Sequence, residues 1–65
     1  MKNILTSREK EIFKYLAQNY STNKVALILK LSEKTVRNHI SNVILKLGVK
    51  NRKQAIMELE KINLI

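Results

Sequence analysis

The sequence predicts an all-α fold, a compact four-helix domain that contains a helix-turn-helix. Apolar residues recur at helical spacing along all 65 residues, and no stretch alternates apolar and polar residues in the manner of a strand. The chain has no Pro and one Gly, Gly48, which lies where a long helical pattern stops. Only Leu31 and Ser32 separate the second and third helical patterns, and so short a connection forces two helices to cross sharply. Residues 1–65 are therefore expected to form one small domain.

The first expected helix covers about residues 7–19. Thr6 and, three residues later, Glu9 have the form of a capping box, in which the hydroxyl and the carboxylate each accept a free backbone amide. Asn19 is expected to end this helix, because Asn tolerates the left-handed backbone conformation common at that place. The residues expected to face inward are Ile12, Phe13, Leu16 and Ala17.

The second expected helix covers about residues 22–30, with Ser21 or Thr22 as its N-cap. Leu27 lies on the side opposite its inward face and Ile28 lies on the flank, which is unusual for a helix at a protein surface. The residues expected to face inward are Val25, Ala26 and Leu29.

The third expected helix covers about residues 33–47, with Ser32 as its N-cap and Gly48 directly after it. Four apolar residues lie within about 60° of one another on the helical wheel and form a stripe for the core. They are Val36, Ile40, Val43 and Leu47. The opposite side is polar and consists of Lys34, Asn38 and Ser41, with Arg37 and Asn42 at its margins.

The fourth expected helix covers about residues 52–62. Asn51 is its expected N-cap, with Gln54 three residues on. The residues expected to face inward are Ala55, Leu59 and Ile62.

The charge of the chain indicates an anionic partner. Thirteen Lys and Arg residues against five Asp and Glu residues give a formal net charge of +8. Glu33 is the only acidic residue between Lys30 and Lys53. A solvated basic face that serves solubility is the alternative interpretation. The cations of this segment are Lys30, Lys34, Arg37, Lys46, Lys50, Arg52 and Lys53.

The third expected helix has the two faces that a DNA-reading helix needs. The major groove is about 12 Å wide and admits one helix, whose other face must be held by a scaffold. Arg37 can donate two hydrogen bonds to guanine, Asn38 can pair with adenine in the same way, and Ser41 can touch a base or a phosphate. Lys34 and Thr35 lie at the positive end of the helix dipole, which favours phosphate.

Other classes of function are disfavoured by the composition. The chain has no Cys, and its single His, His39, has no second ligand for a metal, so we expect neither a metal nor a cofactor. The sequence contains neither a Gly-rich phosphate loop nor a pair of carboxylates suited to acid–base catalysis, so we do not expect an enzyme. No apolar run approaches the roughly 18 residues of a membrane span, and no signal peptide is evident. The expectation is a soluble cytoplasmic protein.

Four segments together resemble a known family. The stretches "LTSREKEI", "SEKTVRNHISNVILKLGV" and "NRKQAIMEL", with the apolar helix after "YST", look like the LuxR/GerE-type helix-turn-helix domain. The resemblance covers the chain from Leu5 to about Leu64. It implies DNA binding through the third helix, with base contacts by Arg37, Asn38 and Ser41. The phosphate contacts that it implies are Thr22, Asn23, Lys34, Thr35, Lys46 and Lys50.

The resemblance also implies dimerisation through the fourth helix. Met57 lies on the side of that helix away from its inward face, and Met is adaptable and suits interfaces. Two copies related by a two-fold axis would place their third helices about one DNA turn apart and read an inverted repeat. The expected dimer interface consists of Met57, Lys61, Leu64 and Ile65.

A second class of function remains open. Leu27 and Ile28 are adjacent and outward-facing, so the chain could be a protein-interaction module that binds RNA polymerase or another regulator. In that case the positive charge would serve solubility. The sequence fits equally a complete small regulator and the DNA-binding part of a longer response regulator.

Overall fold

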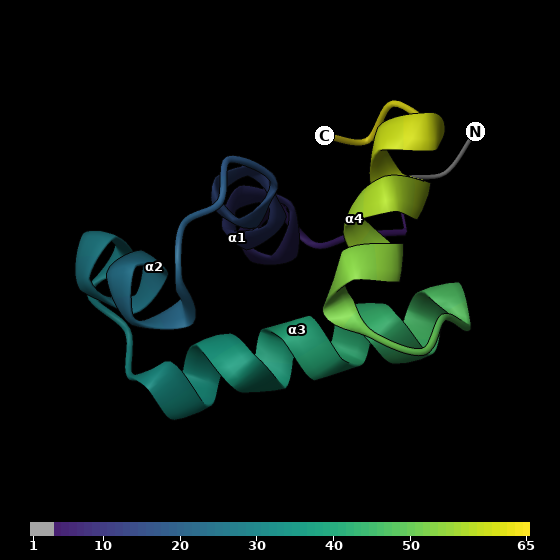
Figure 1. Ribbon diagram of the computed structural model, residues 1–65. Coiled ribbons are helices and arrows are strands. Elements are labelled where there is room, and N and C mark those ends of the chain that lie inside the picture. The colour runs from purple at the N-terminus through teal and green to yellow at the C-terminus, as the bar shows by residue number, and fades with distance from the viewer. Residues whose placement is uncertain (1–3) are drawn as a thin grey trace.

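The structure is a computed structural model that describes residues 4–65. This part of the chain forms four helices, and α3 lies along one side of the molecule with the other three on its inner face (Figure 1). The predicted all-α, four-helix fold with a helix-turn-helix is confirmed. No helix of the described residues is long and apolar enough to cross a membrane. The helices are α1 (Ser7–Ala17), α2 (Thr22–Leu29), α3 (Glu33–Leu47) and α4 (Arg52–Lys61).

Each helix starts at a residue that the sequence predicts as its cap. The Thr6 side chain accepts from the Glu9 amide and the Glu9 carboxylate accepts from the Thr6 amide, which confirms the capping box. Of the two candidates at the start of α2, Ser21 is the cap. Ser32 and Asn51 cap α3 and α4 in the same way, each accepting from the amide three residues on.

The ends of three helices lie one or two residues before the predicted positions, whereas the bounds of α3 are as predicted. Asn19 adopts the left-handed conformation, with φ of 70°, after α1 has ended at Ala17. Lys30 itself is left-handed, with φ of 58°, and therefore leaves α2 as its C-cap. Gly48 has φ of 66° and ends α3, as the sequence predicts.

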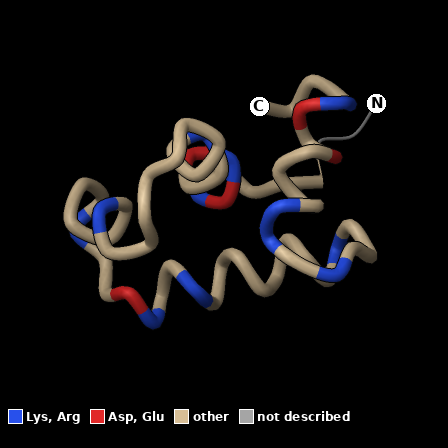
Figure 2. The backbone as a smooth tube through the Cα atoms, in the orientation of Figure 1, with Lys and Arg blue, Asp and Glu red and all other residues tan. Residues whose placement is uncertain are grey.

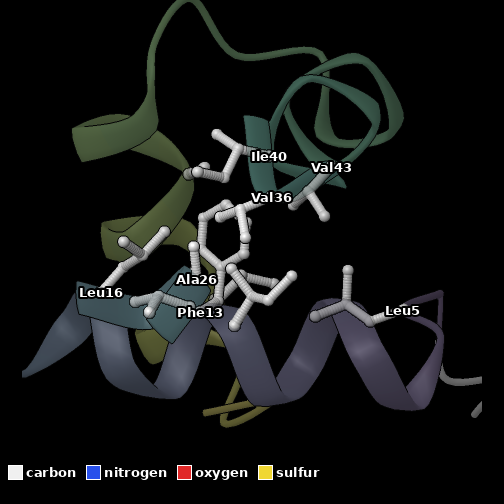
Figure 3. Close-up of a cluster of buried hydrophobic side chains, with 11 residues drawn as sticks. Leu5, Phe13, Leu16, Ala26, Val36, Ile40 and Val43 are labelled. Atoms are coloured by element: carbon white, nitrogen blue, oxygen red, sulfur yellow. The ribbon is translucent and has the colours of Figure 1, made fainter. Parts of the chain in front are cut away.

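The core lies where α1, α2 and α4 meet the inner face of α3. Val36, Ile40 and Val43 of α3 are buried and point toward α1, where Phe13 and Leu16 lie (Figure 3). The predicted apolar stripe is therefore confirmed for these three residues, and Leu47 is half-buried beside them. The remaining buried apolar residues are Leu5, Ile12, Val25, Ala26, Ala55 and Leu59.

The prediction of the core is wrong for one residue, Ile62. Ile62 is 45% exposed, because α4 ends at Lys61 and Ile62 is its C-cap rather than part of another turn. The chain then turns back, and the Leu64 amide donates to the Leu59 carbonyl at 2.9 Å. Leu64 and Ile65 thereby pack half-buried against the core, whereas Ile62 does not.

Candidate DNA interface

The three residues predicted to read bases share the outer face of α3. Arg37, Asn38 and Ser41 are all exposed. Ser41 lies three residues after Asn38 and four after Arg37, which makes it a neighbour of both on the helix surface. The face opposite them is the buried stripe that begins with Val36 and continues with Ile40. The structure therefore leaves all three side chains accessible to a ligand while α3 is held by the core.

Thr35, a predicted phosphate contact, forms hydrogen bonds with Ser32 in the turn between α2 and α3. The Ser32 hydroxyl accepts from the Thr35 amide at 3.0 Å and donates to the Thr35 hydroxyl at 2.9 Å. Thr35 is half-buried at the start of α3, and Lys34 next to it is exposed. Thr35 thus fixes the beginning of α3 in addition to lying near its positive end.

Glu33 joins the two helices of the helix-turn-helix. Its Oε1 accepts from Nη2 of Arg37 at 2.7 Å, and its Oε2 accepts from Nδ2 of Asn23 at 2.8 Å. One carboxylate therefore contacts both a predicted base reader on α3 and a predicted phosphate contact on α2. Glu33 is not among the predicted site residues, although its spacing of four residues from Arg37 is a signal for such a pair.

Arg52 is a second residue near the site that is not among the predicted site residues. Its Nη1 donates to the hydroxyl of Thr22, a predicted phosphate contact, at 3.0 Å. This bond connects the starts of α2 and α4, which lie 30 residues apart in sequence. Lys50, another predicted phosphate contact, is exposed just before α4, and its amide donates to the Gln54 side chain at 3.0 Å.

Lys46 has a partner within the protein. Its ammonium group forms an ion pair with the carboxylate of Glu9 on α1 and donates to the Ile4 carbonyl at 3.2 Å. Glu9 is only 3% exposed. In the structure Lys46 therefore connects α3 to α1, and its contact with phosphate stays a prediction.

The surroundings of Glu9 favour its charged form. Burial by itself raises the pKa of the Glu9 carboxyl, but hydrogen bonds from Lys46 and from the Thr6 amide, together with the charge of Lys46, outweigh it. The pKa therefore lies below the ordinary value for Glu. A buried carboxylate that keeps its charge fixes the ammonium of Lys46 in place.

Positive charge gathers along α3 and at the start of α4. Figure 2 shows Lys and Arg along α3 and in the turn that follows it, whereas the acidic residues lie mainly on α1 and toward the end of α4. Glu33 is the exception, at the start of α3. Glu33 is the one acidic residue from the start of α3 to the start of α4, so this part of the described chain carries an excess of positive charge.

The predicted dimer residues divide into two kinds. Met57 is 60% exposed and Lys61 is exposed, and both line a shallow hollow with Val49, Gln54 and Glu58. Leu64 and Ile65, in contrast, are half-buried against the core of their own chain.

Apolar residues are also exposed on α2 and α3. Leu27 is 68% exposed, Leu45 is 78% exposed, and Ile28 is exposed beside Leu27. The described residues contain no cluster of three His, Asp or Glu side chains that could hold a metal ion.

Comparison with known proteins gives consistent matches. The profile described as "Bacterial regulatory proteins, luxR family" matches residues 3–59. The chain is 57% identical over 58 residues to the spore germination protein GerE of Bacillus subtilis strain 168, covering 89% of this chain and 78% of that protein. It is 44% identical over 55 residues to the transcriptional regulatory protein DegU of Brevibacillus brevis, covering 85% of this chain and 23% of DegU.

Solved structures of similar proteins agree with this result. The structure of the transcription factor GerE superposes with a TM-score of 0.93 at 56% identity, covering 97% of this chain and 94% of that one. The response regulator ChrA of a heme-sensing two-component system superposes with a TM-score of 0.90 at 38% identity, covering all of this chain and 32% of ChrA. The chain thus spans most of GerE but less than a third of DegU and ChrA. The chain belongs to the luxR family of bacterial regulatory proteins and is a helix-turn-helix, DNA-binding transcription regulator rather than an enzyme.

Proposed function

We propose that this protein binds double-stranded DNA sequence-specifically with α3 in the major groove. The observation that carries the proposal is the division of α3 into a buried apolar stripe and an exposed polar face. Arg37 and Asn38 have the donor and acceptor groups for guanine and adenine, and Ser41 lies beside them. These three side chains read bases while the core holds the helix.

The phosphate strands are contacted on both sides of α3. Residues at the starts of α2 and α3 offer short polar groups and amides, and exposed cations supply charge. Such contacts set affinity and orientation but carry no sequence information. The proposed phosphate contacts are Thr22, Asn23, Lys34, Thr35, Lys46 and Lys50.

The protein acts as a homodimer on an inverted repeat. Met57 and Lys61 lie exposed on one side of α4, and the half-buried Leu64 and Ile65 follow in the segment after this helix. A two-fold axis through this surface would present two copies of α3 to successive turns of the same DNA face. A regulator of this kind works on the bacterial chromosome and therefore in the cytoplasm.

The test of base reading compares Arg37→Ala and Asn38→Ala with a matched control. Arg8→Ala is that control, because Arg8 is also an exposed Arg in an ion pair within its own helix, with Glu11 at 3.2 Å on α1. A duplex is first selected from a random pool with the wild-type protein, and affinities are measured by fluorescence anisotropy. We expect each α3 variant to lose about 1–3 kcal/mol of binding to the selected duplex. Unchanged affinity in both variants would refute the proposal.

The dimer is tested in two ways: sedimentation measures the oligomeric state of the protein, and the duplexes selected from the random pool show whether its binding site is symmetric. The pool is expected to yield two half-sites with inverted symmetry, spaced by about one DNA turn. Met57→Glu is expected to abolish paired occupancy of the two half-sites while a single half-site is still bound. A selected site without symmetry would contradict the dimer proposal.

A contact with RNA polymerase through α2 is the second candidate function. The observation that favours it is the exposure of Leu27, at 68%, next to the exposed Ile28. Leu27→Asp is expected to leave DNA affinity unchanged and to reduce transcription in a reconstituted assay with RNA polymerase. Unreduced transcription would leave DNA binding as the sole function of this domain.

A further inference from the structure

Glu33 is an acidic residue inside a basic surface. It is the first residue of α3 and the only acidic residue between Lys30 and Lys53. A carboxylate that faces DNA repels the phosphates, so at this place it weakens general attraction to nucleic acid. The hydrogen bonds that its two carboxylate oxygens accept indicate a different role for Glu33.

Each oxygen of Glu33 accepts a hydrogen bond from a different helix. Oε1 accepts from Arg37 on α3 at 2.7 Å, and Oε2 accepts from Asn23 on α2 at 2.8 Å. Both distances lie in the ordinary range for hydrogen bonds from nitrogen to a carboxylate. The first bond alone would be an ordinary exposed pair within one helix, free to separate. The second bond anchors the carboxylate to α2 and so fixes the point that Arg37 contacts.

Arg37 retains its capacity to read a base while it is held. A guanidinium group carries five N–H donors in one plane, and Glu33 occupies one of them in the structure. The Arg37 side chain is 63% exposed, so its other donors are accessible. A long flexible side chain that is already oriented loses less freedom when it binds.

We infer that Glu33 is a positioning residue for base reading: it holds the guanidinium group of Arg37 in one orientation relative to α2. The inference rests on the proposed function of Arg37. It has a consequence that separates it from a plain charge effect. Removal of the Glu33 charge strengthens attraction to any DNA, yet it weakens the preference for the selected sequence.

Glu33→Gln tests this inference, with Glu11→Gln as the matched control. The introduced glutamine is nearly the same size as glutamate, but an NH2 donor replaces one of the two oxygens. Because Arg37 and Asn23 each donate to a different oxygen of Glu33, one of these two donors would then face another donor and lose its hydrogen bond. Glu11 is also an exposed acid paired with an Arg of its own helix, at 3.2 Å on α1, so both substitutions change the net charge equally. Fluorescence anisotropy gives the affinity for the selected duplex and for a shuffled duplex of the same composition.

We expect the two variants to bind the shuffled duplex as tightly as the wild type or more tightly. Only Glu33→Gln is expected to lower the ratio of the two affinities, by about fivefold or more. The double variant Glu33→Gln with Arg37→Ala is expected to have the same ratio as Arg37→Ala alone, because Glu33 acts through Arg37. An unfolded fraction cancels in this ratio, since both duplexes meet the same protein sample.

Two outcomes would overturn the inference and can be told apart. If Glu33→Gln behaves as Glu11→Gln does on both duplexes while Arg37→Ala loses discrimination, Glu33 does not position Arg37 and the base-reading proposal stands. If Arg37→Ala keeps full discrimination, the proposed role of Arg37 fails, and the role of Glu33 fails with it.

Discussion

Lys46, in the last turn of α3, forms an ion pair with the buried carboxylate of Glu9 on α1, 37 residues away in sequence. The same carboxylate accepts the amide of Thr6 at 3.0 Å and so completes the cap of α1. One side chain thereby connects the start of α1 to the end of α3. The stability of the fold and the placement of α3 depend on the same contact.

Lys46→Met is expected to destabilise the protein by about 2 kcal/mol, because it leaves the buried Glu9 carboxylate without its charged partner. Methionine keeps the length of the side chain, so the loss reports the charge and its hydrogen bonds. Urea unfolding followed by circular dichroism measures the change. Lys24→Met, at an exposed position of α2, is the control and is expected to change the stability by less than about 0.5 kcal/mol.

The lowered pKa of Glu9 predicts a loss of stability in acid. A carboxyl group whose pKa is lower in the folded state binds fewer protons there than in the unfolded chain. Its stabilising contribution is complete above the unfolded pKa of about 4.3 and is lost as the pH falls through the lower folded pKa. Thermal unfolding between neutral pH and acid is expected to show this decline in the wild type.

Glu9→Gln is expected to lower stability at neutral pH and to flatten this acid-dependent decline. Glu11→Gln, which alters an exposed carboxyl group, should preserve the decline. Equal pH profiles for wild type and Glu9→Gln would show that the Glu9 carboxyl does not cause it.

Lys34 and Lys50 are expected to affect all DNA sequences alike. Each is exposed beside the proposed interface, and a contact with phosphate releases counterions regardless of the bases. Each Ala substitution should weaken selected and shuffled duplexes by the same factor and reduce the log–log salt slope by about 0.9. Lys14→Ala, on α1, is the control that should leave the slope unchanged. A sequence-dependent effect of Lys34→Ala would instead assign Lys34 to base contacts.

The two left-handed C-caps predict opposite effects of Gly and Ala. Lys30 adopts φ of 58° at the end of α2 although it has a Cβ atom, so Lys30→Gly is expected to stabilise the protein by about 1 kcal/mol. Gly48 adopts φ of 66° at the end of α3, and Gly48→Ala is expected to cost about 1 kcal/mol.

Backbone conformation, not space, causes the cost at Gly48, because an added Cβ atom would meet nothing within 4 Å. Gly48→Asn is therefore expected to be milder than Gly48→Ala, since Asn tolerates this conformation. Thermal unfolding of the three variants checks the signs. A destabilised Lys30→Gly variant would show that the larger conformational entropy which glycine loses on folding outweighs the relief of backbone strain.

The sequence predicts the helix starts well because their signals are local. Thr6, Ser32 and Asn51 each have a side chain that accepts an amide three residues on, and such patterns are visible in single sequences. The bounds of α3 follow from Ser32 and from Gly48, the one residue for which a left-handed conformation costs little.

Helix ends without Gly are harder to predict. Lys30 gives no sign in its residue type that it leaves the helix, and the helical pattern alone continues to Ile62 after α4 has stopped. Leu64 packs against the core, whereas Ile62, which the pattern places inward, is exposed. Which of these nearby apolar residues packs inward depends on how the chain turns after Lys61.

Some features of the candidate site can also be predicted from local sequence patterns, and others cannot. The exposure of Arg37, Asn38 and Ser41 follows from the period of one helix, and the sequence predicts it. The bonds from Lys46 to Glu9 and from Arg52 to Thr22 join residues 37 and 30 positions apart. They depend on how whole helices pack, which no local pattern of residue types contains.

Because α3 is tied to α2 near its first turn and to α1 near its last, its backbone meets a ligand as a rigid template. A duplex whose groove does not match must then bend or twist to fit, and the energy of that deformation depends on its base steps. Flexible pyrimidine–purine steps outside the reach of any side chain would thereby become part of what the protein selects. In the proposed mode of binding, the contacts of α3 with α1 and α2 would therefore affect selection at base pairs that no side chain touches.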